Sequence, residues 1–174
     1  MRKISAHEIA LSAVACAFGT IALTVGTLYS PLLFTGYLLA GVATMLPLAK
    51  GWYRGSALCW LAASLITLLF NGFNIFDTLP FIVFFGLHPI VNALQLRLNV
   101  NRWVALFIKA AWFDGAMYFV WRVVFEATTA LPWLDQYFLP ILLVGGTLLF
   151  FPYDYLTYFI QCCITRVVNK LIKK

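Results

Sequence analysis

Ionisable side chains inside long apolar stretches are the residues of this chain with the most chemical potential, because such groups are costly at membrane depth and mark functional sites by default. One stretch holds the largest set. Asp114, Tyr118 and Arg122 are spaced i, i+4 and i+8, so they share one helix face, with Trp121 beside them. This face predicts the wall of a binding site, and a brace between helices is the alternative for Asp114. Lys109 is expected on the opposite face, with its amine reaching the cytoplasmic surface.

Two further apolar stretches carry polar stripes at helical spacing. His88 and Asn92 form one stripe, and Asp154 and Tyr158 form the other. A hydrogen bond to a neighbouring helix is the alternative role for His88, and Pro89 directly after it predicts a local break. Asp154 closely follows another proline, so capping a helix start is its alternative to ligand binding.

Motifs of nucleotide, metal or acyl chemistry are absent from the sequence, which contains no GxxxxGK[ST], HExxH or GxSxG. The two histidines are far apart, and the four cysteines show no CxxC spacing and are expected to be apolar fillers. We therefore expect a chain that is not an enzyme and binds no metal or cofactor of its own. The net charge of +6 comes from dispersed basic residues, which argues against a nucleic-acid partner.

The elements that position these side chains are predicted membrane helices. Apolar residues make up 63% of the 174, and about 20 of them cross the ~30 Å hydrocarbon core as a helix. The sequence predicts an all-α bundle of six transmembrane helices in one integral membrane domain, 1–174, with spans at about 7–28, 31–49, 52–70, 78–96, 103–125 and 137–168. The last span is too long for a perpendicular crossing. Either a tilted helix bends near Pro152, or a short outer segment precedes the crossing.

The charges of the connectors predict the orientation. Lys and Arg cluster at the N-terminus, in the second and fourth connectors and at the C-terminus, whereas the other connectors carry Asp77, Glu126 and Asp135 and no basic residue. Short cytoplasmic loops are enriched in Lys and Arg, so both termini are expected in the cytoplasm of a bacterium, with the chain in its cell membrane. The basic C-terminal tail is expected to lie on an anionic membrane surface.

Aromatic side chains favour a small-molecule pocket over a simple interface belt, because Phe, Tyr and Trp make up 17% of the chain. We expect a ring-shaped ligand near the outer leaflet, among the last three spans. Its predicted contacts are Asn74, His88, Asn92, Asp114, Tyr118, Trp121, Arg122, Trp133, Asp154 and Tyr158. Arg122 is the strongest candidate, since a guanidinium binds an anionic or carbonyl group.

The first span carries a stripe of small residues. Ala10, Ala13 and Ala17 lie along one side of the predicted helix, and stripes of small residues let membrane helices approach closely. The stripe predicts an interface with a membrane partner, and packing inside the bundle is the alternative.

Several segments together resemble the substrate-binding S components of energy-coupling-factor (ECF) vitamin transporters. They are a basic N-terminus leading into an Ala-rich span, the connector KGWYRG at 50–55, the segment LPF…FGL at 79–87, and FPYDYL at 151–156 before a Lys-rich tail. The resemblance covers essentially the whole length of the chain.

The resemblance implies a subunit that captures one vitamin or related micronutrient and works with a transmembrane coupling subunit and two cytoplasmic ATPases, which use the ATP. It implies that Ala13 and Ala17 form the partner-facing Ala-xxx-Ala motif, with Ala10 as a second candidate. It also implies a pocket in the outer halves of helices four to six.

Two other classes remain open. A scaffold of cell-wall synthesis similar to the rod-shape protein MreD would have the same length and helix number but would need no pocket. A small membrane enzyme acting on lipids would need clustered acids near one interface, whereas the acids here are dispersed. The sequence does not identify the ligand.

Overall fold

The protein folds into helices throughout the part that the structure describes. The computed structural model covers residues 6–125 and 132–171, with side chains described for 6–122 and 137–171. The elements, in chain order, are α1 (Ala6–Leu28), η1 (Ser30–Leu32), α2 (Leu33–Leu48), α3 (Tyr53–Phe70), α4 (Ile75–Pro80), η2 (Phe81–Phe85), α5 (His88–Leu98), α6 (Arg102–Phe125), α7 (Pro132–Ile141), η3 (Leu142–Gly146) and α8 (Thr147–Leu171).

Six of these helical runs are long and apolar enough to cross a membrane. They are Ala6–Leu28, Ser30–Leu48, Tyr53–Phe70, Ile75–Leu98, Arg102–Arg122 and Tyr137–Leu171. The all-α bundle of six membrane-length helices predicted from the sequence is therefore confirmed, and the spans begin and end within three residues of the predicted bounds. The chain is a multi-pass membrane protein by helix length and hydropathy.

Helices α1, α2 and α3 form a tight three-helix unit whose closest contact depends on glycine. A Cβ atom on Gly36 of α2 would lie 2.9 Å from the carbonyl oxygen of Ala22 and 3.0 Å from Gly26 of α1. Only two glycines allow the backbones to approach this closely. The internal face of α1 therefore runs through Ala15, Gly19 and Gly26, all buried.

The fourth span is interrupted in its middle. Helix α4 begins after Asn74, whose side chain accepts a hydrogen bond from the backbone amide of Phe76. The next turn is a π-helix, η2, and α5 starts at His88 with Pro89 in its first turn. The break predicted from Pro89 thus lies just before that proline, where the wider helix turns Phe84 and Phe85 inward.

An aromatic core joins the fourth span to the last two. The ring of Phe84 lies 5.0 Å from that of Phe113 on α6 and 5.9 Å from that of Tyr153 on α8, between ring centroids. Phe84 and Phe150 are almost completely buried. These rings pack η2 against α6 and α8, and His88 of the polar cluster described below lies directly beside them.

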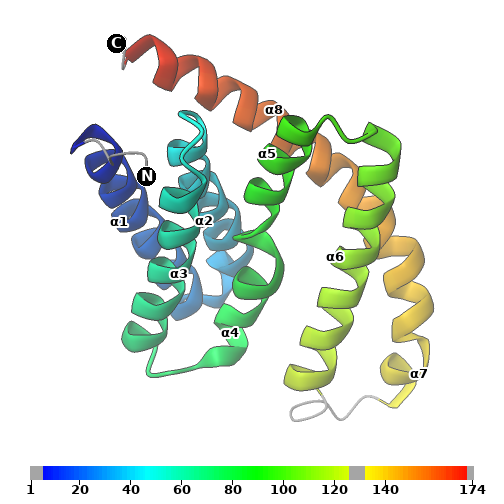
Figure 1. Cartoon of the computed structure of the whole chain (residues 1–174). Coiled ribbons are helices and arrows are strands. Elements are labelled where there is room, and N and C mark those ends of the chain that lie inside the picture. Colours follow the sequence, from blue (N-terminus) through cyan, green and yellow to red (C-terminus); the bar gives the residue numbers. More distant parts are fainter. Residues whose placement is uncertain (1–5, 126–131, 172–174) are drawn as a thin grey trace.

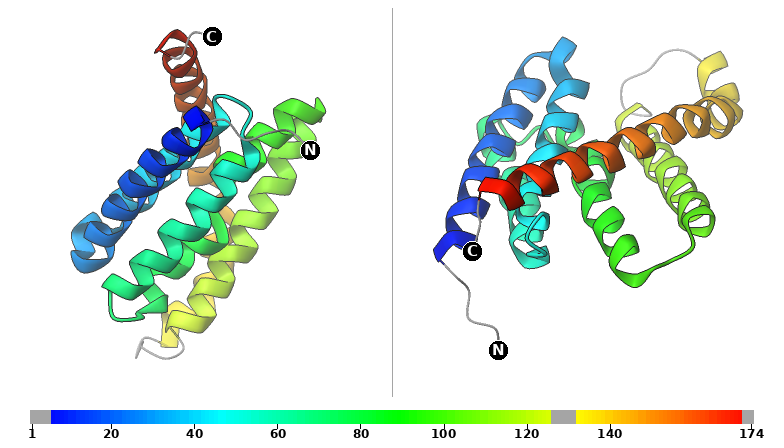
Figure 2. Two further views of the ribbon diagram at one scale, coloured as in Figure 1. Left: turned by 60° about the vertical axis from the view of Figure 1, so that its left-hand side comes forward. Right: turned by 90° about the horizontal axis from the view of Figure 1, so that it is seen from above.

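The last span is one long, tilted helical run that is interrupted by η3 and not by Pro152. α7 leads into the π-helix η3 and then into α8, which continues through Pro152 to Leu171. Asp154 therefore lies inside α8, and its predicted role as the cap of a helix that begins after Pro152 is wrong. The C-terminal half of α8 runs obliquely across one end of the bundle, toward α1 (Figures 1 and 2).

The start of α1 and the end of α8 lie at the same end of the bundle, as an even number of spans requires (Figure 1). This end, which we call the basic end, also carries the α2–α3 and α5–α6 connectors with Lys50, Arg97 and Arg102. The assignment of the basic end to the cytoplasm stays a prediction from the charge pattern.

Candidate functional site

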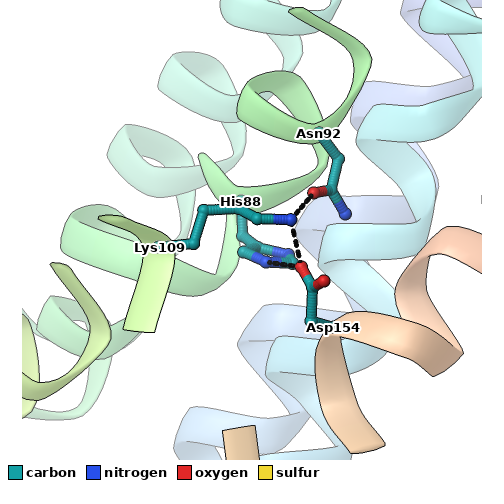
Figure 3. Close-up of polar contacts among 4 residues, drawn as sticks. All are labelled: His88, Asn92, Lys109 and Asp154. Carbon is teal, nitrogen blue, oxygen red and sulfur yellow. Dashed lines mark hydrogen bonds and ion pairs between the residues drawn. The ribbon is translucent and has the colours of Figure 1, made fainter. Parts of the chain in front are cut away.

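Four side chains from three helices form a hydrogen-bonded ion cluster inside the bundle. The Lys109 amine donates to Asn92 Oδ1 at 2.6 Å and to Asp154 Oδ1 at 2.5 Å, and His88 Nε2 lies 3.0 Å from the same carboxylate oxygen (Figure 3). The His88 tautomer with the proton on Nε2 donates to this oxygen. His88 and Asn92 come from α5, Lys109 from α6 and Asp154 from α8.

The ion cluster is withdrawn from lipid and from solvent. His88 is 0% exposed, Asn92 3% and Lys109 4%, while the Asp154 side chain keeps 14% of its surface. A lone charge at this depth would be expensive, and pairing with hydrogen bonds on both partners offsets that cost. Lys109 is seven residues from the start of α6, so its backbone lies about 10 Å in from the basic end.

Lys109 is the residue whose environment the sequence analysis misplaced. We expected its amine to reach the membrane surface, but the structure turns it into the bundle against Asn92 and Asp154. Lys109 and Asp114 lie on different sides of α6, as expected, yet the side with Lys109 faces α5 and α8 and not lipid. The usable signal was the position of an ionisable residue in the middle of an apolar span, which is itself a site indicator.

A polar cavity of about 270 Å³ lies between the ion cluster and the basic end. We call it the polar cavity. It is lined by Asn92, Gln95, Leu96, Asn99, Val100, Arg102, Lys109, Asp154 and Tyr158. Asn99 and Val100 belong to the α5–α6 connector and Arg102 begins α6, so the cavity opens at the basic end. Its amides, two cations and one carboxylate can bind a small polar solute.

The ten predicted ligand contacts do not come together in one place. Asn92, Asp154 and Tyr158 line the polar cavity, with His88 behind them. Asp114 and Tyr118 line a different cavity, between α6 and the α7–η3 segment. Five of the ten residues are thus divided between two separate cavities, and Asn74, Trp121 and Arg122 line neither of them.

The outer part of α6 is held by aromatic contacts. Arg122 Nε donates to the Tyr118 hydroxyl at 3.0 Å, and the guanidinium lies over the same ring at 5.6 Å from its centroid. Trp121 stacks on Phe138 at 4.0 Å between ring centroids. Asp114 accepts a hydrogen bond from the Thr147 hydroxyl at 2.9 Å.

The predicted site also included two residues expected in connectors, Asn74 and Trp133. Asn74 uses both ends of its amide locally, accepting from Phe76 and donating to Asp77 Oδ2 at 2.7 Å, so it stabilises the start of α4. It is distant in sequence and structure from the ion cluster. The side chain of Trp133 lies outside the described residues, as does Glu126.

The Ala stripe predicted as a partner interface is on the outside of α1. Ala10, Ala13 and Ala17 are exposed, whereas Ala15 and Gly19 pack against α2. Among the described residues, no group of three or more His, Cys, Asp or Glu side chains is placed to hold a metal ion.

The chain matches no protein-family model, no curated protein and no solved structure. The resemblance to S components therefore stays a hypothesis. Only the geometry of the site bears on it.

Proposed function

We propose that this chain is the substrate-capture subunit of an ECF-type importer for a small, polar micronutrient. The polar cavity is the observation that carries the proposal. A membrane scaffold gains nothing from a hollow lined by Lys109, Asp154 and amide groups, and buried charges that line a cavity are typical of solute pathways. A binding subunit needs such a hollow.

The chemistry of the polar cavity fits a solute with both acceptor and donor groups. Lys109 and Arg102 offer cationic donors, Asp154 offers a carboxylate, and Gln95 adds an amide. Because the ion cluster is already formed by protein groups, these side chains are held in place before a solute arrives. Such preorganisation lowers the entropy cost of binding.

The two faces of α1 support the partner side of the proposal. The bundle buries one small-residue face, through Ala15 and Gly19, and leaves a second, with Ala13 and Ala17, uncovered. Membrane helices associate through small residues, so the second face suits the transmembrane coupling subunit that the S-component resemblance implies. Two ATPases bound to that subunit would supply the energy.

The position of the polar cavity adds a direction to the proposal. With the basic end in the cytoplasm, the cavity opens on the side where an importer releases its substrate. We propose that Lys109 and Asp154, with the aromatic core beside them, close the polar cavity toward the opposite end of the bundle in the present conformation.

Mass spectrometry of small molecules that copurify with the detergent-solubilised protein tests the proposal. We expect one polar micronutrient in the wild type, a loss of at least about tenfold in Tyr158→Ala, and retention in Tyr155→Ala. Both tyrosines are exposed on α8, but only Tyr158 lines the polar cavity. No enriched molecule, together with no thermal stabilisation by a panel of vitamins, would favour the scaffold.

A further inference from the structure

We propose that the second cavity, between α6 and the α7–η3 segment, binds a lipophilic amine through Asp114. We call it the lipid-side cavity. Its volume is about 470 Å³, and it is lined by Phe107, Ala110, Ala111, Asp114, Gly115, Tyr118, Leu139, Leu142, Leu143 and Thr147. The volume falls in the range of about 300–1,000 Å³ that is usual for small-molecule pockets. The site is separate from the polar cavity and independent of the proposed transport function.

Asp114 is the chemical reason for the proposal. Its Oδ2 accepts from Thr147, whereas its buried Oδ1 accepts no hydrogen bond from any residue that the structure describes. The described ion pairs involve Asp154 and not Asp114. A carboxylate in the hydrocarbon region without a cation is costly, so the site is completed by a proton or by a cationic partner.

The two cations on either side of Asp114 along α6 are already engaged with other side chains. Lys109 turns to the other side of α6 and binds Asp154, and Arg122 donates to the Tyr118 hydroxyl. The other elements that line the cavity contribute only apolar side chains and one hydroxyl: Leu139 from α7, Leu142 and Leu143 from η3, and Thr147 from α8. An amine from outside the chain therefore meets no competing cation among these lining residues, and the Asp114 carboxylate turns its buried Oδ1 toward the cavity when the amine binds.

The apolar rim and the depth of the cavity indicate that the amine is attached to a lipophilic molecule. Phe107, Leu139 and Leu143 at its rim are exposed on the membrane-facing surface. Asp114 is twelve residues into α6, about 18 Å from the basic end and thus near the bilayer midplane. Lipid headgroups do not reach this depth, so the occupant is a molecule with one amine on an apolar body.

The π-helix η3 shapes the wall opposite Asp114. Leu142–Gly146 forms the wider turn, and single π-turns are frequent at functional sites. An amine that reaches the site in its ammonium form makes an ammonium–carboxylate hydrogen bond with Asp114, which is stronger than a neutral one.

Photo-crosslinking of the full chain in detergent tests this proposal with two probes, dodecylamine and dodecanol, each carrying a diazirine in the alkyl chain. We expect the amine, at low concentration, to label peptides containing 107–118 and 139–147 at least about tenfold more than the alcohol does. Equal labelling of these peptides by both probes in the wild type would overturn the proposal without any variant.

Two leucine variants form a matched pair for the same experiment. A Cβ on Gly115 or on Gly145 meets no atom within 4 Å, so both positions accept a larger side chain, but only Gly115 lines the lipid-side cavity. We expect Gly115→Leu to abolish amine labelling and Gly145→Leu to preserve it. Asp114→Asn should reduce it at least about tenfold. Full labelling in Gly115→Leu or in Asp114→Asn would exclude this site.

Discussion

At the scale of single residues, the ion cluster buries charged groups whose desolvation cost is offset by their mutual hydrogen bonds. One carboxylate oxygen of Asp154 accepts hydrogen bonds from both Lys109 and His88, and Asn92 Oδ1 accepts a further hydrogen bond from Lys109. Each charge is tolerable only because its partner is present. The cluster therefore contributes specificity to the packing of α5, α6 and α8 more than it contributes net stability.

The mutual dependence of Lys109 and Asp154 predicts strong coupling. Lys109→Met or Asp154→Asn should each destabilise the protein by about 3–5 kcal/mol, because either leaves one buried charge without its counterion. The double variant should lose clearly less than the sum of the two. Thermal unfolding in detergent, followed with a thiol-reactive dye, measures all three.

Lys170→Met serves as the control for this cycle, since Lys170 lies on the exposed C-terminal turn of α8 and should change stability by less than about 0.5 kcal/mol. Additive losses in the double variant would show that the two side chains act independently.

At the scale of the elements, α1 presents two faces with different tasks. Its inner face is fixed by glycine contacts with α2, and its outer Ala face is left uncovered by the bundle. A change on the outer face should affect only what binds there. The two functions of the helix can therefore be separated by substitution.

Ala13→Trp and Ala17→Trp should abolish uptake in cells that carry the coupling subunit and ATPases, because a bulky side chain prevents close helix approach. Melting temperature and copurified ligand should stay at wild-type values. Uptake of the identified ligand and thermal unfolding are the two measurements.

Two residues provide the controls, one on α8 and one on the inner face of α1. Leu149 is 72% exposed on α8, away from the Ala stripe, so Leu149→Trp should transport normally. Ala15 is 0% exposed, so Ala15→Trp should unfold the bundle. Parallel loss of uptake and stability in Ala13→Trp would assign the Ala stripe to internal packing.

At the scale of the whole molecule, the bundle is asymmetric. The basic end carries the α2–α3 and α5–α6 connectors and the oblique half of α8 (Figures 1 and 2). Lys50 lies in the first connector, Arg97 and Arg102 flank the second, and the polar cavity lined by Asn99 and Arg102 opens there. The opposite end carries the α3–α4 turn with Asp77. This asymmetry ties the function of the cavity to the orientation of the chain.

Cysteine labelling in intact cells measures the orientation. Phe73→Cys, in the exposed α3–α4 turn, should react with a membrane-impermeant maleimide from outside. Val100→Cys, in the α5–α6 connector, should react only after permeabilisation. The parent protein is the control, because its Cys16, Cys59, Cys162 and Cys163 all lie within spans. The reverse pattern would put the polar cavity on the outer side.

The number and bounds of the spans were predictable from the sequence alone. Hydropathy along the chain reports how each segment partitions between water and hydrocarbon, and the charges that interrupt it mark the ends of helices. The break near Pro89 was predictable for a different local reason, because a proline disturbs the helix through its own backbone.

Only the tertiary structure decided which side of each helix is buried. Lipid tails and the bundle interior are equally apolar, so α6 carries no amphipathic signal that tells its lipid-facing side from its packed side. Lys109 was for that reason assigned to the wrong environment, and the sequence left Asp114 open between a cavity wall and a brace between helices. The packing of α5 and α8 turned Lys109 toward Asp154, and it left Asp114 beside Thr147 in a cavity of its own.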